Sequence, residues 1–179
     1  MSQRFVLFPR GINVGKTNRV PMAELRAHLQ AQGFTDVATL LASGNIIATH
    51  PEVMNSVDAA DMLRGIMTEQ FGVTVPVIAK TAEEFKAAVK SAPLAHAEHD
   101  GSRFLLTFFN CQPDPVSVKE LLDHDFAPEA ITIIGACAYV WAPNGVLASA
   151  LNYRALEKAL TVTATARNWN TITKIAAKL

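Results

Sequence analysis

The strongest constraint on the fold is a regular alternation of short strand-like segments with amphipathic helical segments. Over the first ninety residues the order is strand, helix, strand, strand, helix, strand, followed by one more helix. That order is typical of a ferredoxin-like α+β fold. The expected segments are the strand 5–8, the helix 21–32, the strands 37–41 and 46–49, the helix 58–71, the strand 75–79 and the helix 81–90.

The same order begins again in the second half of the chain. A polar stretch with proline and glycine, Ser91 to Ser102, separates the halves and predicts a linker. We therefore expect an α+β fold of two ferredoxin-like halves with a C-terminal helix, residues 1–95 and 96–179, that share a sheet edge or pack face to face. The later segments are the strand 104–109, the helix 115–124, the strands 131–134 and 138–141, and the helix 147–160.

One uncharged stretch, Ala130 to Tyr153, is long enough to cross a bilayer. Gly135 interrupts it, and Pro143-Asn144-Gly145 is a strong turn signal. These breaks favour two buried strands followed by a helix, so we expect no membrane partner. At the N-terminus, Phe5 to Pro9 is shorter than the apolar core of a secretory signal.

The overall charge is balanced, with 16 Lys and Arg against 16 Asp and Glu among 179 residues. A neutral chain lacks the basic footprint of a general nucleic-acid binder, so nucleic acid is not an expected partner. Cys111 and Cys137 are too few for a secreted disulfide framework and have no metal-ligand spacing. We therefore expect a reduced, cytoplasmic location.

The turn from Arg10 to Arg19 combines glycines, asparagines and cations between a strand and a helix. Its ending resembles a phosphate-binding loop, but three residues separate Gly11 from Gly15 where that loop has four. Two interpretations stay open. Backbone N–H groups with Arg10, Lys16 and Arg19 form an anion site, or the glycines permit positive φ angles while Asn13 or Asn18 bonds the turn's own backbone.

A second motif, Ser43-Gly44-Asn45, follows a strand that we expect to pair beside the first strand. That pairing would bring the hydroxyl of Ser43 and the amide of Asn45 near Arg10. The alternative is a bulge or tight turn in which these side chains bond the backbone. Ser43 is not expected to be a nucleophile, because no Gly-x-Ser-x-Gly elbow surrounds it and no histidine and acid pair is assignable to it.

The C-terminal segment predicts a helix capped by Thr163 or Thr165. Arg167 and Asn168 then lie in the first turn, where a positive charge opposes the helix dipole. This placement indicates a partner for Arg167. The guanidinium of arginine can donate two parallel hydrogen bonds to a carboxylate or a phosphate. The partner of Arg167 is therefore either an acidic side chain of this protein or a bound ligand.

Together these motifs resemble the bacterial family catalogued as domain of unknown function 1697. The resemblance runs from the first strand to the last helix and implies a two-part α+β fold with ferredoxin-like halves, but no established activity. The sequence departs from the family pattern at Pro9, Lys16 and Ala48. The motifs that carry the resemblance are Arg10-Gly-Ile-Asn-Val-Gly15, Asn18 with Met22, Gly33-Phe34, Ser43-Gly44-Asn45 and Thr165-Ala-Arg-Asn-Trp-Asn-Thr171.

No catalytic residue or cofactor follows from the sequence, and whether the protein is an enzyme stays open. His96, His99 and Asp100 lie in the expected linker without a fourth ligand, so no metal site is expected.

The leading hypothesis is a small phosphorylated or carboxylated ligand held where the glycine-rich turn, the serine-glycine-asparagine bend and the C-terminal arginine converge. An RNA- or protein-interaction module and a homodimer are the alternatives. The expected ligand-binding residues are Arg10, Gly11, Asn13, Gly15, Lys16, Asn18, Ser43, Asn45, Arg167 and Asn168.

Overall fold

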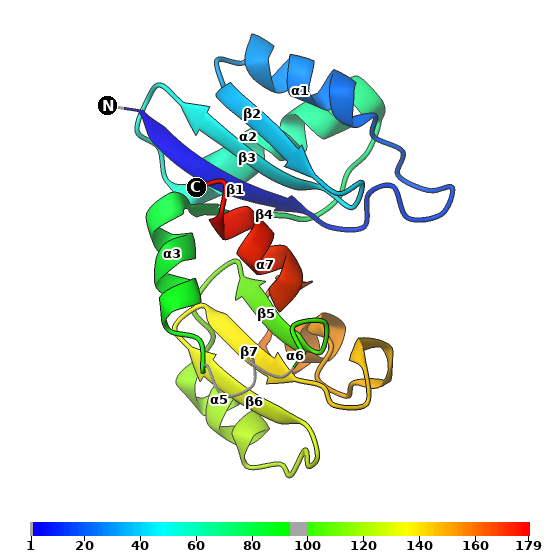
Figure 1. Ribbon diagram of the computed structural model, residues 1–179, viewed down its shortest axis with the longest axis vertical. Helices are drawn as coiled ribbons and strands as arrows, with labels where there is room; N and C mark the ends of the chain where they lie inside the picture. The colour runs from blue at the N-terminus through cyan, green and yellow to red at the C-terminus, as the bar shows by residue number, and fades with distance from the viewer. Residues whose placement is uncertain (1, 94–99) are drawn as a thin grey trace. The chain divides into compact units, whose positions relative to one another are not determined.

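The computed structural model describes residues 2–93 and 100–179. The chain divides into two compact units, one of Met1–Ala87 with Ala177–Leu179 and one of Ala88–Ala176. Each unit contains a four-stranded antiparallel sheet with helices, which makes the fold α+β as predicted (Figure 1). His96 and His99 of the expected linker lie outside the described residues.

The first unit follows the predicted order of strands and helices. Its strands are arranged β2-β3-β1-β4, with every neighbouring pair antiparallel, which is the ferredoxin-like arrangement. The elements are β1 (Gln3–Pro9), α1 (Met22–Ala31), β2 (Thr35–Leu40), β3 (Asn45–His50), α2 (Ser56–Phe71) and β4 (Val77–Thr81), followed by α3 (Ala82–Lys90), whose last residues belong to the second unit.

Local side-chain contacts explain where these helices begin. The predicted capping box precedes α3, since the Thr81 N–H donates to Glu84 Oε2 at 2.7 Å and the Glu84 N–H donates to Thr81 Oγ1 at 3.1 Å. Helix α2 begins two residues earlier than predicted, because Asn55 Oδ1 accepts the Asp58 N–H at 2.8 Å and acts as the N-cap.

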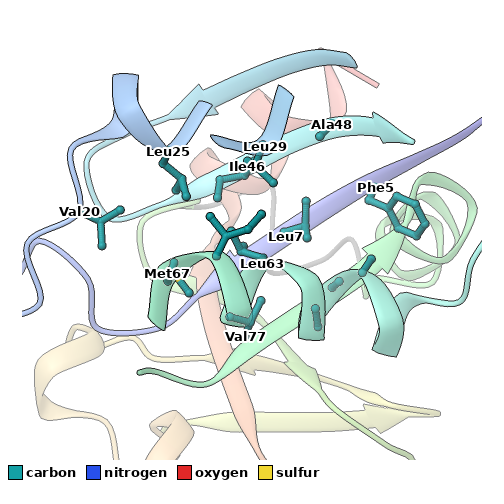
Figure 2. Packing of buried hydrophobic residues seen from close by; sticks show 14 of the residues in the cluster. Phe5, Leu7, Val20, Leu25, Leu29, Ile46, Ala48, Leu63, Met67 and Val77 are labelled. Atoms are coloured by element: carbon teal, nitrogen blue, oxygen red, sulfur yellow. The ribbon is translucent and has the colours of Figure 1, made fainter. Parts of the chain in front are cut away.

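Helices α1 and α2 cover one face of the first sheet. In Figure 2, Leu25 and Leu29 of α1 and Leu63 of α2 point toward Leu7 and Ile46 of the sheet. All five side chains are fully buried. Burying this apolar area is the main stabilising contribution to the first unit.

The position of the strand before Ser43 differs from the prediction. Strand β2 is an outer strand, and β3, which follows the bend, pairs with β1. The exposed residues at the start of β2 fit an outer position, whereas β3 is almost entirely buried. The bend therefore joins the outer strand to the strand next to β1.

The second unit repeats the same arrangement, with strand order β6-β7-β5-β8. The uncharged stretch forms β6, β7 and a short 3-10 helix, and none of the described helices has the length and apolar character needed to cross a membrane. The elements are β5 (Phe104–Phe109), α5 (Pro115–Leu122), β6 (Ala130–Ile134), β7 (Cys137–Trp141), η1 (Val146–Ala148), α6 (Tyr153–Leu160), β8 (Ala164–Asn168) and α7 (Trp169–Ala176).

The C-terminal prediction was wrong in one respect, because Arg167 and Asn168 belong to strand β8 and not to a first helical turn. Strand β8 pairs with β5, and Thr165 is buried within it. The alternation of threonine and alanine before Arg167 is a period-two pattern that favours a strand. Asn168, rather than Thr163 or Thr165, caps α7, since its Oδ1 accepts the Thr171 N–H at 3.0 Å.

Tyr139 of β7 supports a prediction about alkaline stability. Its hydroxyl donates to the Ala88 carbonyl at 2.6 Å, and burial, helped by Cys137, raises the pKa of the phenol. Tyr139→Phe is expected to lower the free energy of unfolding by about 1 kcal/mol at pH 8, because the Ala88 carbonyl loses its donor.

Above pH 10 the difference in the free energy of unfolding between the wild type and Tyr139→Phe is expected to shrink. The phenol ionises in the unfolded chain and stays protonated in the folded chain, so the wild type loses about 1.4 kcal/mol per pH unit. Urea unfolding of both proteins at pH 8 and pH 11 measures this. An equal difference at the two pH values would contradict the raised pKa.

Candidate functional site

The loop between β1 and α1 is held in shape by the side chain of Asn13. Its Nδ2 donates to the carbonyl of Val20 at 2.9 Å and to that of Ala42 at 3.1 Å. Its Oδ1 accepts the Val20 N–H at 2.8 Å. The amide therefore ties the two ends of the loop together and ties the loop to the β2–β3 turn. Figure 1 shows the loop projecting beside that turn.

Asn18 closes the loop a second time. Its Nδ2 donates to the Gly11 carbonyl at 3.0 Å, and its own carbonyl accepts the Asn13 N–H at 3.0 Å. Both asparagines thus bond the turn's own backbone, which is one of the two interpretations of this sequence. Their amides form the frame of the loop.

The backbone of this loop alternates in the sign of φ. The angle is +73° at Gly11, +54° at Asn13 and +59° at Gly15, and it is not positive at Ile12 or Val14 between them. An alternation of φ sign is one requirement for a backbone concavity whose N–H groups suit an anion, and in this loop the Asn13 N–H is already donated to the Asn18 carbonyl. Gly11 and Gly15 are exposed, with open space where a Cβ would stand.

The serine-glycine-asparagine bend packs directly against this loop. Gly44 is buried at φ +81°, and a Cβ there would lie 2.7 Å from Ile12 Cδ1 and 2.9 Å from Pro9 Cγ. Asn45 is fully buried, and its Nδ2 donates to the Leu40 carbonyl at 2.9 Å. The structure thus brings the first two motifs together, and Ser43 is the exposed member of the bend.

The loop and the bend carry only positive charge, and the nearest acid along the chain after the loop is the exposed Glu24 in the first turn of α1. Lys16 and Arg19 are exposed and Arg10 is partly exposed, while the segments 9–23 and 37–49 contain no Asp or Glu. In a chain of zero net charge this is a local excess of three positive charges. Such an excess attracts anions without requiring a basic protein overall.

The second unit provides an internal comparison for the length of this loop. Twelve residues, 10–21, separate β1 from α1, whereas five residues, 110–114, make the corresponding connection from β5 to α5. The second unit shows that five residues are enough to join strand and helix in this fold. The seven additional residues of the first loop are therefore not required by the topology. Long loops on a rigid scaffold commonly carry function.

Arg167 lies in the second unit, on strand β8. Its Nη1 donates to Thr165 Oγ1 and to the Ala166 carbonyl, both at 2.8 Å. Burial lowers the pKa of the guanidinium to about 10, so it remains charged at neutral pH. The Oδ1 atom of Asn168 accepts the hydrogen bond that caps α7. The expected convergence of Arg167 with the first loop remains a prediction.

Within residues 2–93 and 100–179 no group of three His, Cys, Asp or Glu side chains could hold a metal ion. Asp100, considered earlier as a ligand, accepts hydrogen bonds from the Ser102 hydroxyl at 2.6 Å and the Ser102 N–H at 2.9 Å. These bonds lower the pKa of its carboxyl group. This carboxylate therefore has a local structural role.

Sequence reasoning left out two residues that build the candidate site. Ile12 is fully buried within a turn whose other residues are exposed or partly exposed, and the Ala42 carbonyl accepts a hydrogen bond from the Asn13 amide. An isolated isoleucine between Gly11 and Asn13 was a usable signal of an anchored loop. The role of Ala42 had no signal, because any residue offers a carbonyl.

The fold and the loop define an α+β protein of two ferredoxin-like halves, with a long cationic loop in the first half. The chain belongs to the family described as "Protein of unknown function (DUF1697)", whose model matches residues 1–139. The matched range contains the glycine-rich loop and the bend, while Arg167 lies beyond it.

Among solved structures, the chain is similar to the conserved bacterial protein SP0830 from Streptococcus pneumoniae. The two share 23% sequence identity with a TM-score of 0.77, and the similarity covers 99% of each chain. No curated protein matches the sequence. The comparisons therefore support the fold and the family.

Proposed function

We propose that the protein binds a small phosphorylated or carboxylated ligand at the loop from Arg10 to Arg19. The observation that carries the proposal is the alternation of φ sign from Gly11 to Gly15 on a loop with three cations. Backbone N–H groups bind anionic oxygens at short range, and the cations raise the local concentration of anions. The N–H groups of Asn13 and Thr17 bond within the loop, so the proposal assigns this role to other N–H groups of the loop.

The residues of the loop have distinct roles in this proposal. Asn13, Asn18 and Asn45 hold the loop and the bend in shape through the hydrogen bonds described above. Gly11 and Gly15 supply backbone for close approach of the ligand. The contacts with the ligand come from Arg10, Lys16, Arg19 and the hydroxyl of Ser43. Arg167 and Asn168 are the proposed contributors from the second unit.

The test is a thermal-shift titration of the full chain with inorganic phosphate, a nucleoside monophosphate and citrate, at constant ionic strength. At a tenfold excess over Kd, a ligand stabilises the folded state by about 1.4 kcal/mol, or roughly 3–5 °C. The double variant Lys16→Ala/Arg19→Ala is expected to lose most of this rise. Lys86→Ala/Lys90→Ala removes two exposed charges from α3 and is the matched control.

Arg167→Ala tests the contribution of the second unit separately. A reduced ligand response in this variant supports a shared site, and an unchanged response confines the site to the loop. Equal stabilisation of the wild type and the double variant by every anion would refute the loop as the binding site.

The alternative function is an RNA-interaction module. Retention of RNA that falls steeply with salt, and is lost in the double variant, would favour that class over a small ligand. We also propose a cytoplasmic location, because Cys111 and Cys137, both in the described part of the chain, form no disulfide bond.

A further inference from the structure

The four outer strands of the two sheets differ in how they are protected against pairing with another chain. Strand β2 carries Asp36 and a register shift, β4 carries Lys80, and β8 carries Arg167. Charges and irregularities of this kind prevent edge-to-edge association. Strand β6, with the sequence Ala-Ile-Thr-Ile-Ile, has neither a charge nor a proline, and it pairs with β7 without a register shift.

The turn after β6 determines which backbone groups face outward. A two-residue turn, Gly135-Ala136, joins β6 to β7, so the flanking residues Ile134 and Cys137 form a hydrogen-bonded pair. Bonded and non-bonded pairs alternate along an antiparallel ladder. The N–H and C=O groups of Ile131 and Ile133 therefore point away from β7, toward the edge that no other described strand covers.

A bond on the far side of β7 agrees with this assignment. The Ala136 carbonyl accepts the Phe109 N–H of β5 at 2.9 Å. In β7, the backbone N–H and C=O groups of the even-numbered residues therefore face β5. Those of the odd-numbered residues Cys137, Tyr139 and Trp141 face β6. The partners of these odd-numbered residues in β6 are Ala130, Thr132 and Ile134.

We propose that a second copy of this chain pairs with β6 in antiparallel orientation, about a two-fold axis through Thr132. In that register Ile131 of one copy lies opposite Ile133 of the other, and both carry outward N–H and C=O groups. Two such pairs form four backbone hydrogen bonds. The two second-unit sheets then join into one sheet of eight strands.

The sequence of β6 favours a second copy over an unrelated strand. Isoleucines flank Thr132 on both sides, so a two-fold axis through Thr132 sets Ile131 of one copy opposite Ile133 of the other and pairs apolar side chains with each other. Ile131 and Ile133 pack against the core of the second unit, and they would contact each other across the axis. Ile134, 45% exposed, would be covered opposite Ala130 of the second copy.

Sedimentation velocity of the full chain over a range of concentrations tests the proposal. The wild type is expected to form a reversible dimer. Thr132→Glu places two like charges opposite each other and is expected to raise the dimer dissociation constant at least tenfold, as is Thr132→Lys. An equimolar mixture of the two variants is expected to restore the dimer. Thr132 is exposed, so the folded monomer tolerates both changes.

Thr35→Glu, at an exposed threonine of the outer strand β2, is the matched control and is expected to leave the dimer unchanged. A wild type that stays monomeric at several hundred micromolar overturns the proposal. So does a dimer that survives Thr132→Glu, or a mixture of the charged variants that stays monomeric. Hydrogen exchange of the wild type is a second measurement, in which the Ile131 and Ile133 amides gain protection as concentration rises.

Discussion

Replacing Gly44 with alanine is expected to lower the free energy of unfolding by about 2–4 kcal/mol. The backbone at Gly44 has φ +81°, which alanine adopts only with strain. In addition, the new Cβ would lie 2.7 Å from Ile12 Cδ1 and 2.9 Å from Pro9 Cγ. Ile12 is fully buried, so neither the bend nor the loop has room to move aside.

Urea unfolding of the wild type and Gly44→Ala measures this loss. Gly65→Ala is the matched control, because Gly65 lies inside helix α2 with nothing within 4 Å of a Cβ. The control is expected to gain about 0.5–1 kcal/mol from the higher helix propensity of alanine. A Gly44→Ala protein within 0.5 kcal/mol of the wild type would show that the bend and the loop do not pack as described.

Asn13→Ala is expected to lower the free energy of unfolding by roughly 2–4 kcal/mol. The change removes three side-chain hydrogen bonds, two to Val20 and one to Ala42. Val20 is 1% exposed, so water cannot readily replace the lost bonds. Alanine is also strained at φ +54°, where asparagine is tolerated.

Asn13→Gly separates these two causes, because glycine accepts the positive φ without strain. We expect it to lose roughly 1–3 kcal/mol, from the hydrogen bonds alone. Asn18→Gly removes one side-chain bond at a similar positive φ and is expected to lose less than Asn13→Gly. Urea unfolding ranks the three variants. The reverse order for the two glycine variants would contradict the role assigned to Asn13.

Much of the fold was predictable because its signals are local. The Thr81 and Glu84 capping box lies within four residues, and the apolar strand Phe104–Phe109 has the predicted bounds. Strand β8 was missed because its identity depends on pairing with β5, more than fifty residues away in sequence. The sequence there also fits a capped helix, so only the tertiary pairing decides between the two.

The candidate site was predictable in composition but not in the roles of its residues. Glycines, asparagines and cations marked the loop from Arg10 to Arg19. Whether Asn13 faces a ligand or the backbone depends on the Ala42 carbonyl, which is 29 positions away along the chain. The register of β2 and β3 brings that carbonyl within reach, and no pattern near Asn13 encodes this register.

The first compact unit is discontinuous, because Ala177–Leu179 belong to it together with Met1–Ala87. One hydrogen bond joins these two segments of the first unit: Arg4 Nη2 donates to the Lys178 carbonyl at 3.0 Å. During synthesis the ribosome makes Lys178 after the whole second unit. The N-terminal sheet can therefore assemble early, but it gains this contact only after the whole second unit has been synthesised.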